Sequence, residues 1–401
     1  MFRDTIITDT SFVSKFILGL KLGLYLSKPQ LHHLILIIST MIMKGYNGKI
    51  TDSYELMPAR HRTCIGKFLS NSTWNEDYVH KALQKYVVKT IWDISKETGC
   101  PIYVIIDDTI SERTKPSSKA ENPIEKCSFH NSHLKGKSVY GHQLVTLMLS
   151  CNNVVMPYSI LIYDKEDMSK IEMAIELIKS LPAPVSTGYV MCDSWYSNKK
   201  LFKASKEAGY GYIGGLRTNR VIYPKGHERL GAKINVFAKT LTKEQVNLVK
   251  VGKREFYVYS YIGKLNDLKC AHIVFSWPKD ALFKEGALRV FISLDPNMTA
   301  EELLNHYAYR WPIETFFREC KKRLGLDDYQ VRTHTSIKRY FVILMLTYVF
   351  CGLEVADETL NFSAGIKIAR KQLEVEKITS IANQLNSGKS VNEVVEIFTA
   401  A

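Results

Sequence analysis

Three carboxylates are the residues of this chain best suited to chemistry. Asp108 follows a short apolar, β-branched run at 102–106, and Asp193 follows a second apolar run at 188–192. Glu314 lies far along the chain, in a segment rich in Arg and Lys. Three carboxylates can hold two Mg²⁺ or Mn²⁺ ions roughly 3.5–4 Å apart, an arrangement that promotes attack of a hydroxyl on phosphate. One strand-end aspartate alone would more often be a solvated turn residue.

Asp107 competes with Asp108 for the first of these positions. Adjacent residues of a strand point to opposite faces of the sheet, so we expect only one of the two to be a ligand. The residues by themselves leave this choice open.

A stripe of polar side chains accompanies Glu314 on one helix. At about 100° per residue, four of them fall within about 60° of arc; they are Tyr307, Arg310, Glu314 and Lys321. Arg318 joins this face. The ordinary alternative is an exposed face with an ion pair between Arg310 and Glu314. Pro312 predicts a kink or a restart just before Glu314, because proline inside a helix costs roughly 3 kcal/mol.

The elements around the two aspartates predict an α/β core. They are a strand at 102–106, a hairpin at 142–150 and 154–163, a helix at 169–180, a strand at 188–192 and a helix to about 208. Asn152 and Asn153 stand where the hairpin needs φ > 0, and Ser197 is a candidate cap for the last helix. This order is typical of the first part of a ribonuclease H-like fold, in which strand ends bring acids together.

Five regions follow from these patterns. They are a helical N-terminal region at 1–95, the first part of the ribonuclease H-like core at 96–210, a β-rich insertion at 211–297, a helical second part with the third acid at 298–355, and C-terminal helices at 356–401. Thr299 and Glu302 predict a capping box at the start of the second part. Basic and apolar residues mix at 52–80, which suits a DNA-end-binding module or a plain helical bundle equally well.

The charge of the chain points to a polyanionic partner. There are 54 Lys and Arg against 40 Asp and Glu, a net charge of +14. Residues 196–254 alone carry fourteen Lys and Arg and three Glu. A basic excess confined to one stretch predicts a track for phosphates, although each single cation, such as Lys199 or Arg217, is most simply a solvated charge.

Neither a zinc knuckle nor a membrane span is expected. The eight cysteines form no CxxC pair, and the N-terminus lacks the layout of a signal peptide. The apolar runs at 34–43 and 341–353 are shorter than the ~20 residues that span a bilayer. We therefore predict buried core helices at both runs, and a cytoplasmic protein without membrane contact.

The spacing Tyr307-x2-Arg310-x3-Glu314-x6-Lys321 resembles the Tyr-Arg-Glu-Lys signature of a branch of bacterial insertion-sequence transposases of the DDE type. The resemblance extends over about residues 100–350 and includes the β-rich insertion between the second and third acids. In that family the first acid precedes a threonine, which favours Asp108, since Thr109 follows it.

The resemblance implies that Asp108, Asp193 and Glu314 hold two metal ions, Mg²⁺ or Mn²⁺, and that the protein cuts and joins DNA. Its implied DNA contacts are Tyr307, Arg310, Trp311, Arg318 and Lys321. Among these, Trp311 would stack on an unpaired base or pack in the core. The implied partners are double-stranded DNA, as terminal inverted repeats and as target, and a second copy in a synaptic homodimer. The implied location is bacterial, in the cytoplasm at the nucleoid.

Two other interpretations share part of this pattern. A transposase-derived DNA-binding regulator without catalysis would be free to lose an acid, yet all three are present. A ribonuclease H-like nuclease without strand transfer would keep the acids but would not need the stripe around Glu314. Within the insertion, Trp277 could act as a wedge for a flipped base, although buried packing is the favoured interpretation.

Overall fold

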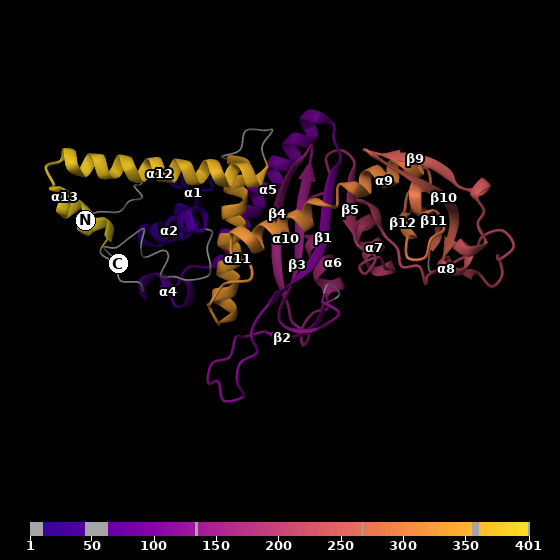
Figure 1. Ribbon diagram of the computed structural model, residues 1–401, viewed down its shortest axis with the longest axis horizontal. Coiled ribbons are helices and arrows are strands. Elements are labelled where there is room, and N and C mark those ends of the chain that lie inside the picture. Colours follow the sequence, from indigo (N-terminus) through magenta and orange to yellow (C-terminus); the bar gives the residue numbers. More distant parts are fainter. Residues whose placement is uncertain (1–10, 45–62, 133–134, 267, 355–360, 400–401) are drawn as a thin grey trace.

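The computed structural model describes residues 11–44, 63–132, 135–266, 268–354 and 361–399. It is elongated, with helices from both ends of the sequence at one side, a sheet in the middle and a β-rich part at the other side (Figure 1). The basic residues Arg60, His61 and Arg62, which we considered for DNA-end binding, lie outside the described residues.

The described N-terminal region is helical, as predicted. Its elements are α1 (Phe12–Gly19), η1 (Leu22–Leu24), α2 (Lys28–Lys44), α4 (Thr63–Ser70) and α5 (Glu76–Thr98). Asn75 caps α5 through its side chain, and Gly99 ends the helix with φ 68°, a left-handed conformation that glycine adopts without strain. Residues 34–43 are largely buried, which confirms the core helix expected there.

The first half of the core follows the predicted order, except that β2 (Ser128–Ser132) adds a strand between the first strand and the hairpin. Its elements are β1 (Ile102–Glu112), β2 (Ser128–Ser132), β3 (Lys137–Cys151), β4 (Val154–Tyr163), α6 (Lys170–Lys179), β5 (Gly188–Cys192), α7 (Lys199–Glu207) and β6 (Gly211–Gly215). The β3–β4 hairpin turns at Asn152 and Asn153, with φ 47° and 67°, as expected. Ser197 is not the cap of α7. Asn198 caps it, while the buried Ser197 hydroxyl bonds the carbonyl of Gly215.

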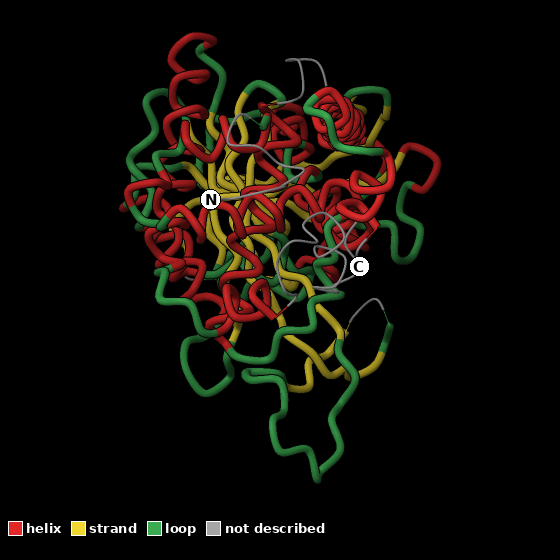
Figure 2. The backbone as a smooth tube through the Cα atoms, turned by 90° about the vertical axis from the view of Figure 1, so that its left-hand side faces the viewer, coloured by secondary structure: helices red, strands yellow, loops and turns green. Residues whose placement is uncertain are grey.

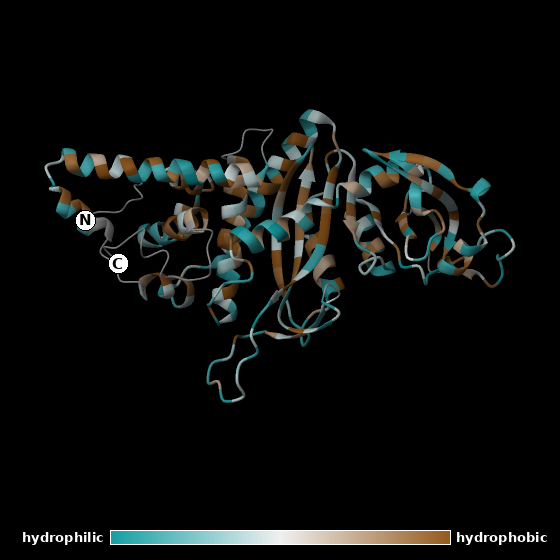
Figure 3. Cartoon of the chain, in the orientation of Figure 1, coloured by the Kyte–Doolittle hydropathy of each residue, from teal (hydrophilic) through white to brown (hydrophobic). Residues whose placement is uncertain are grey.

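Strand β1 is longer than the sequence predicted. It continues through both aspartates to Glu112, because β3 pairs with it antiparallel as far as Gly141. The loop between β1 and β2 projects from the body in two views at right angles (Figures 1 and 2). The central strands are mostly hydrophobic, whereas this loop is mostly hydrophilic (Figure 3).

The β-rich part continues the central sheet. It contains β7 (Val221–Ile222), β8 (Ala232–Lys233), α8 (Ile234–Phe237), β9 (Asn247–Val251), β10 (Arg254–Leu265), β11 (Leu268–Pro278) and β12 (Arg289–Ser293), with short turns η2 (Ala238–Thr240), η3 (Lys243–Gln245) and η4 (Lys279–Ala281). The strand order within the described residues is β2-β3-β1-β5-β6-β12-β11-β10-β7-β8. Strands β1, β5 and β6 are parallel neighbours, and β12 joins β6 antiparallel. Trp277 on β11 is only 2% exposed, so it packs in the core and is no wedge.

The second half of the core is helical. It consists of α9 (Ala300–Ala308), α10 (Pro312–Arg323), α11 (His334–Val349) and η5 (Phe350–Glu354), followed by α12 (Phe362–Asn386) and α13 (Val391–Thr399). The predicted capping box of Thr299 and Glu302 is present. The predicted restart is also present, since α10 begins at Pro312, where the missing N–H of proline costs nothing.

One described helix, at His334–Leu353, is long and apolar enough to cross a membrane, but 83% of it is buried in the protein. This burial confirms the core helix expected at 341–353. Arg339 of this helix is 5% exposed and connects it to the N-terminal helices. Its guanidinium donates to the carbonyls of Leu69 and Ser72 at 3.0 and 2.8 Å, and to the Glu76 carboxylate at 3.2 Å.

Candidate active site

Asp107 and Asp193 end up side by side because of strand register. In the parallel pair of β1 and β5, Ile106 lies opposite Cys192. The residue that follows in each of the two segments is an aspartate, and register partners in neighbouring strands project to the same face. The Asp107 carboxylate therefore lies near Asp193, whose negative charge contributes to raising the pKa of Asp107.

Arg310 joins Asp107 to the third acid. Its guanidinium donates to Asp107 Oδ2 at 2.7 Å and to Glu314 Oε1 at 3.0 Å. Arg310 and Asp107 are mostly buried, with side chains 12% and 15% exposed, while Glu314 is 40% exposed. The gap between α9 and α10 makes this possible. Arg310 lies in the gap, and Glu314 occupies the first turn of α10.

Burial is the main influence on Asp107. It raises the pKa of that carboxyl to about 7, helped by the nearby charges of Asp193 and Glu314, while Arg310 acts in the opposite direction. The Arg310 guanidinium thus does not offset the effect of burial on this carboxyl. Among the described residues, no three or more His, Cys, Asp or Glu side chains form a ready metal cluster. The hard oxygen donors nevertheless fit a divalent cation such as Mg²⁺ or Mn²⁺.

The raised pKa of Asp107 predicts a pH-dependent stability. Its carboxyl ionises less readily in the folded protein, so its favourable contribution is complete below about pH 4 and is lost as the pH rises through about 7. Without divalent cations, we expect Asp107→Asn to stabilise the protein at pH 8 by more than about 1 kcal/mol, and hardly at pH 4. Thermal unfolding of both proteins across this range in EDTA measures the difference. A constant difference at every pH would contradict the shifted pKa.

Asp193 is oriented by its own turn. Its Oδ1 accepts hydrogen bonds from the backbone N–H groups of Trp195 and Tyr196 at 2.9 and 3.3 Å.

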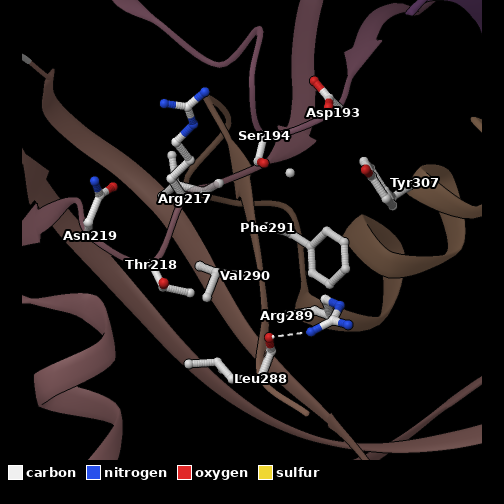
Figure 4. A pocket seen from close by; sticks show the side chains of 12 residues that line it. Asp193, Ser194, Arg217, Thr218, Asn219, Leu288, Arg289, Val290, Phe291 and Tyr307 are labelled. Atoms are coloured by element: carbon white, nitrogen blue, oxygen red, sulfur yellow. Dashed lines mark hydrogen bonds between the residues drawn. The ribbon is translucent and has the colours of Figure 1, made fainter. Parts of the chain in front are cut away.

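Asp193 also borders a cavity of about 590 Å³, seen in Figure 4. Arg217 and Arg289 line this cavity, and Tyr307 stands near Asp193 at its upper edge in that view. A carboxylate and two exposed guanidinium groups thus share one hollow.

Tyr307 and Lys321 flank the acids. The Tyr307 ring lies 4.7 Å from that of Phe291, and burial raises the pKa of its hydroxyl to about 12, so the hydroxyl remains a donor at neutral pH. Lys321, further along α10, donates to the Ile110 carbonyl of β1 at 2.8 Å and pairs with Asp327 at 3.3 Å. The structure therefore brings Tyr307, Arg310, Glu314 and Lys321 to one side of β1.

Trp311 and Arg318 lie elsewhere. Both line a second cavity, of about 860 Å³, which Asp107, Asp193 and Glu314 do not border. Trp311 is 62% exposed, so core packing does not explain it. Arg318 contacts Thr315 at 3.3 Å and Glu319 at 3.9 Å, and its place among the DNA contacts stays a prediction.

Asp108, the first acid predicted from the sequence, points away from the other two. Its Oδ1 accepts from Lys170 Nζ at 2.9 Å and from the Tyr196 hydroxyl at 2.8 Å. Its Oδ2 accepts from Gln143 Nε2 at 2.5 Å. The cause is strand alternation, because Asp107 takes the face that Arg310 and Glu314 share.

A family model for the transposase DDE domain matches residues 98–350, more than half of the chain. The chain belongs to the DDE transposase family. The match begins just before β1, ends in η5 and contains Asp107, Asp108, Asp193 and Glu314. No curated protein matches the chain. As a member of this family, the transposase acts on DNA.

Sequence reasoning missed some residues of this candidate site. Asp107 was left as the weaker candidate, although the aligned ends of the two apolar runs, 102–106 and 188–192, carried a usable signal. No pattern in the sequence pointed to Arg289, because only the pairing of β12 with β6 brings it to the cavity that Asp193 borders. Arg217 was one of many basic residues in its segment, and nothing local distinguished it.

Proposed function

We propose that this transposase cleaves DNA at the ends of its element and joins the freed 3′ ends to target DNA, using Asp107, Asp193 and Glu314 as metal-binding acids. The observation that carries the proposal is the Asp107–Arg310–Glu314 bridge beside Asp193. Asp107 takes the role that the family pattern suggested for Asp108. The core around them is proposed to be ribonuclease H-like, of the Tyr-Arg-Glu-Lys branch found in bacterial insertion sequences.

Two divalent ions, Mg²⁺ or Mn²⁺, are the proposed cofactors. When bound, such ions supply activation of the attacking oxygen and stabilisation of the leaving one. The protein's own part is to hold the carboxylates in place. Arg310 does this for two of them, and the Trp195 and Tyr196 N–H groups do it for Asp193.

The cations beside the acids are proposed to bind the DNA backbone. Arg310 and Lys321 carry the charge, and the Tyr307 hydroxyl can donate to a phosphate oxygen. Arg217 and Arg289 extend this set across the cavity next to Asp193. The exposed Lys199 and Lys200 at the start of α7 belong to the basic stretch 196–254. The proposed partners are the terminal inverted repeats, target DNA and a second protein copy, in the bacterial cytoplasm.

Trp311 is the proposed stacking residue for an unpaired base at the DNA end. We expect Trp311→Ala to weaken binding of a DNA end with unpaired bases about 5- to 150-fold, since stacking contributes about 1–3 kcal/mol per base. Its thermal unfolding should stay unchanged, because the ring is 62% exposed. Titration of labelled DNA measures the affinity. An equal loss with fully paired DNA would exclude base stacking as the cause.

The test of the function is a cleavage and joining assay. The purified transposase is incubated with a donor DNA carrying the element's own ends and with a target plasmid, in Mg²⁺, in Mn²⁺ or in EDTA. We expect excision and 3′-end joining in either metal and none in EDTA. Cleavage without joining would favour a nuclease, and end binding without any cleavage would reduce the chain to a DNA-binding regulator.

A further inference from the structure

Asp108 lies at the centre of a polar network behind the proposed acids. Its carboxylate, 16% exposed, receives hydrogen bonds from three parts of the chain. Gln143 comes from β3, Lys170 from the start of α6, and Tyr196 from the turn after β5. Three donors on one carboxylate fix its position and that of each partner.

This network holds the turn that orients Asp193. Tyr196 is fully buried and donates to Asp108, and the Lys170 ammonium lies 4.0 Å above the Trp195 ring. Trp195 and Tyr196 also pack edge to face, with centroids 4.9 Å apart. These two residues supply the backbone N–H groups that Asp193 Oδ1 accepts. Asp108 is therefore linked to Asp193 through one intervening residue, Tyr196.

We propose that Asp108 is a positioning residue, which fixes the Asp193 carboxylate by holding Tyr196 and Lys170 on the opposite face of β1. The inference rests on the proposed function, since it assigns Asp193 to metal binding. Consecutive aspartates then have separate tasks. Asp107 faces the reacting groups, whereas Asp108 anchors the turn at Trp195 and Tyr196 that positions Asp193. Partners of this kind typically change metal affinity or activity 10–100-fold when removed.

The test compares Tyr196→Phe, Asp108→Asn and Asp107→Asn in the full-length protein. Tyr196→Phe removes one hydroxyl and keeps the buried ring. We expect Tyr196→Phe and Asp108→Asn to lower cleavage about 10–100-fold and to raise the half-saturating Mn²⁺ concentration about as much, with unchanged affinity for DNA ends. Asp107→Asn should be inactive at every Mn²⁺ concentration. Lys179→Met, at an exposed ion pair of α6, is the control and should match wild type.

A second pair of variants separates positioning from general loss of structure. Lys170→Met should raise the half-saturating Mn²⁺ concentration. Lys170→Arg keeps a cation beside Asp108 and should therefore have the half-saturating Mn²⁺ concentration of wild type. Calorimetric titration of Mn²⁺ into the protein bound to DNA ends reports the same effect without cleavage. If wild type binds Mn²⁺ but does not cut, the proposed function fails, while this titration still decides the inference.

Two results would overturn the inference. In the first, Asp108→Asn is as inactive as Asp107→Asn and no longer binds Mn²⁺ in the calorimetric titration. Asp108 would then be a metal ligand itself. The other is wild-type Mn²⁺ dependence in both Tyr196→Phe and Asp108→Asn, because the network would then not place Asp193. Neither result would contradict cleavage and joining by wild type.

Discussion

Replacing Asp193 by Asn, or Glu314 by Gln, is expected to lower excision at least about 10³-fold, which corresponds to about 4 kcal/mol in the activation barrier. The amides keep the shape of the side chains but lose the charge that holds a divalent cation. Each carboxylate lies on a different element, one after β5 and one on α10, so neither can replace the other. Excision from a donor plasmid in Mg²⁺ measures the effect.

The matched control for these variants is Glu301→Gln. Glu301 is an exposed carboxylate on α9, so its loss should leave excision at the wild-type level. DNA-end affinity should persist in the two site variants, because the cations around the acids remain. Substantial excision by Asp193→Asn or Glu314→Gln would remove that residue from the metal-binding set.

Arg339→Met is expected to destabilise the protein by about 3–5 kcal/mol, because it leaves buried partners of a guanidinium without their donor. Those partners are the carbonyls of Leu69, Ser72 and Trp74 and the carboxylate of Glu76. The guanidinium also lies 4.6 Å above the Trp74 ring, and methionine cannot reproduce that contact. Urea-induced unfolding, followed by circular dichroism, measures the change.

Lys338→Met provides a neighbouring comparison on the same helix. Lys338 pairs with Glu76 at 3.7 Å and with Asp77 at 3.3 Å, but it is 38% exposed. Exposed ion pairs contribute about 0–1 kcal/mol, so we expect a small change in the free energy of unfolding. Equal destabilisation by the two variants would mean that burial of Arg339 is not what links α11 to the N-terminal helices.

Local patterns were enough to predict much of the fold. The β3–β4 hairpin followed from Asn152 and Asn153, and the start of α9 followed from Thr299 and Glu302. The restart of the helix before Glu314 followed from Pro312. Each of these features depends on residues close together in sequence, where side-chain chemistry decides the backbone conformation.

Long-range pairing decided what could not be predicted. Whether Asp107 or Asp108 faces Asp193 depends on how β1 pairs with β5, more than eighty residues away, and a shift of one residue reverses the answer. The sequence also suggested a separate insertion from residue 211, yet β6 belongs to the parallel strands and β12 pairs with it. The direction of the Arg318 side chain, which contacts Thr315, could not be predicted either, because a long side chain at the edge of a helix face can turn either way.

The continuous sheet has a mechanical consequence. Backbone hydrogen bonds run without interruption from β1 through β5 and β6 to β12, β11 and β10, so no hinge along this path separates the acids from the far β-rich edge. The distance between the acids and this edge is therefore fixed by the sheet. A DNA end that contacted both would have to adapt its own shape to this spacing, at a cost that depends on the sequence of the DNA.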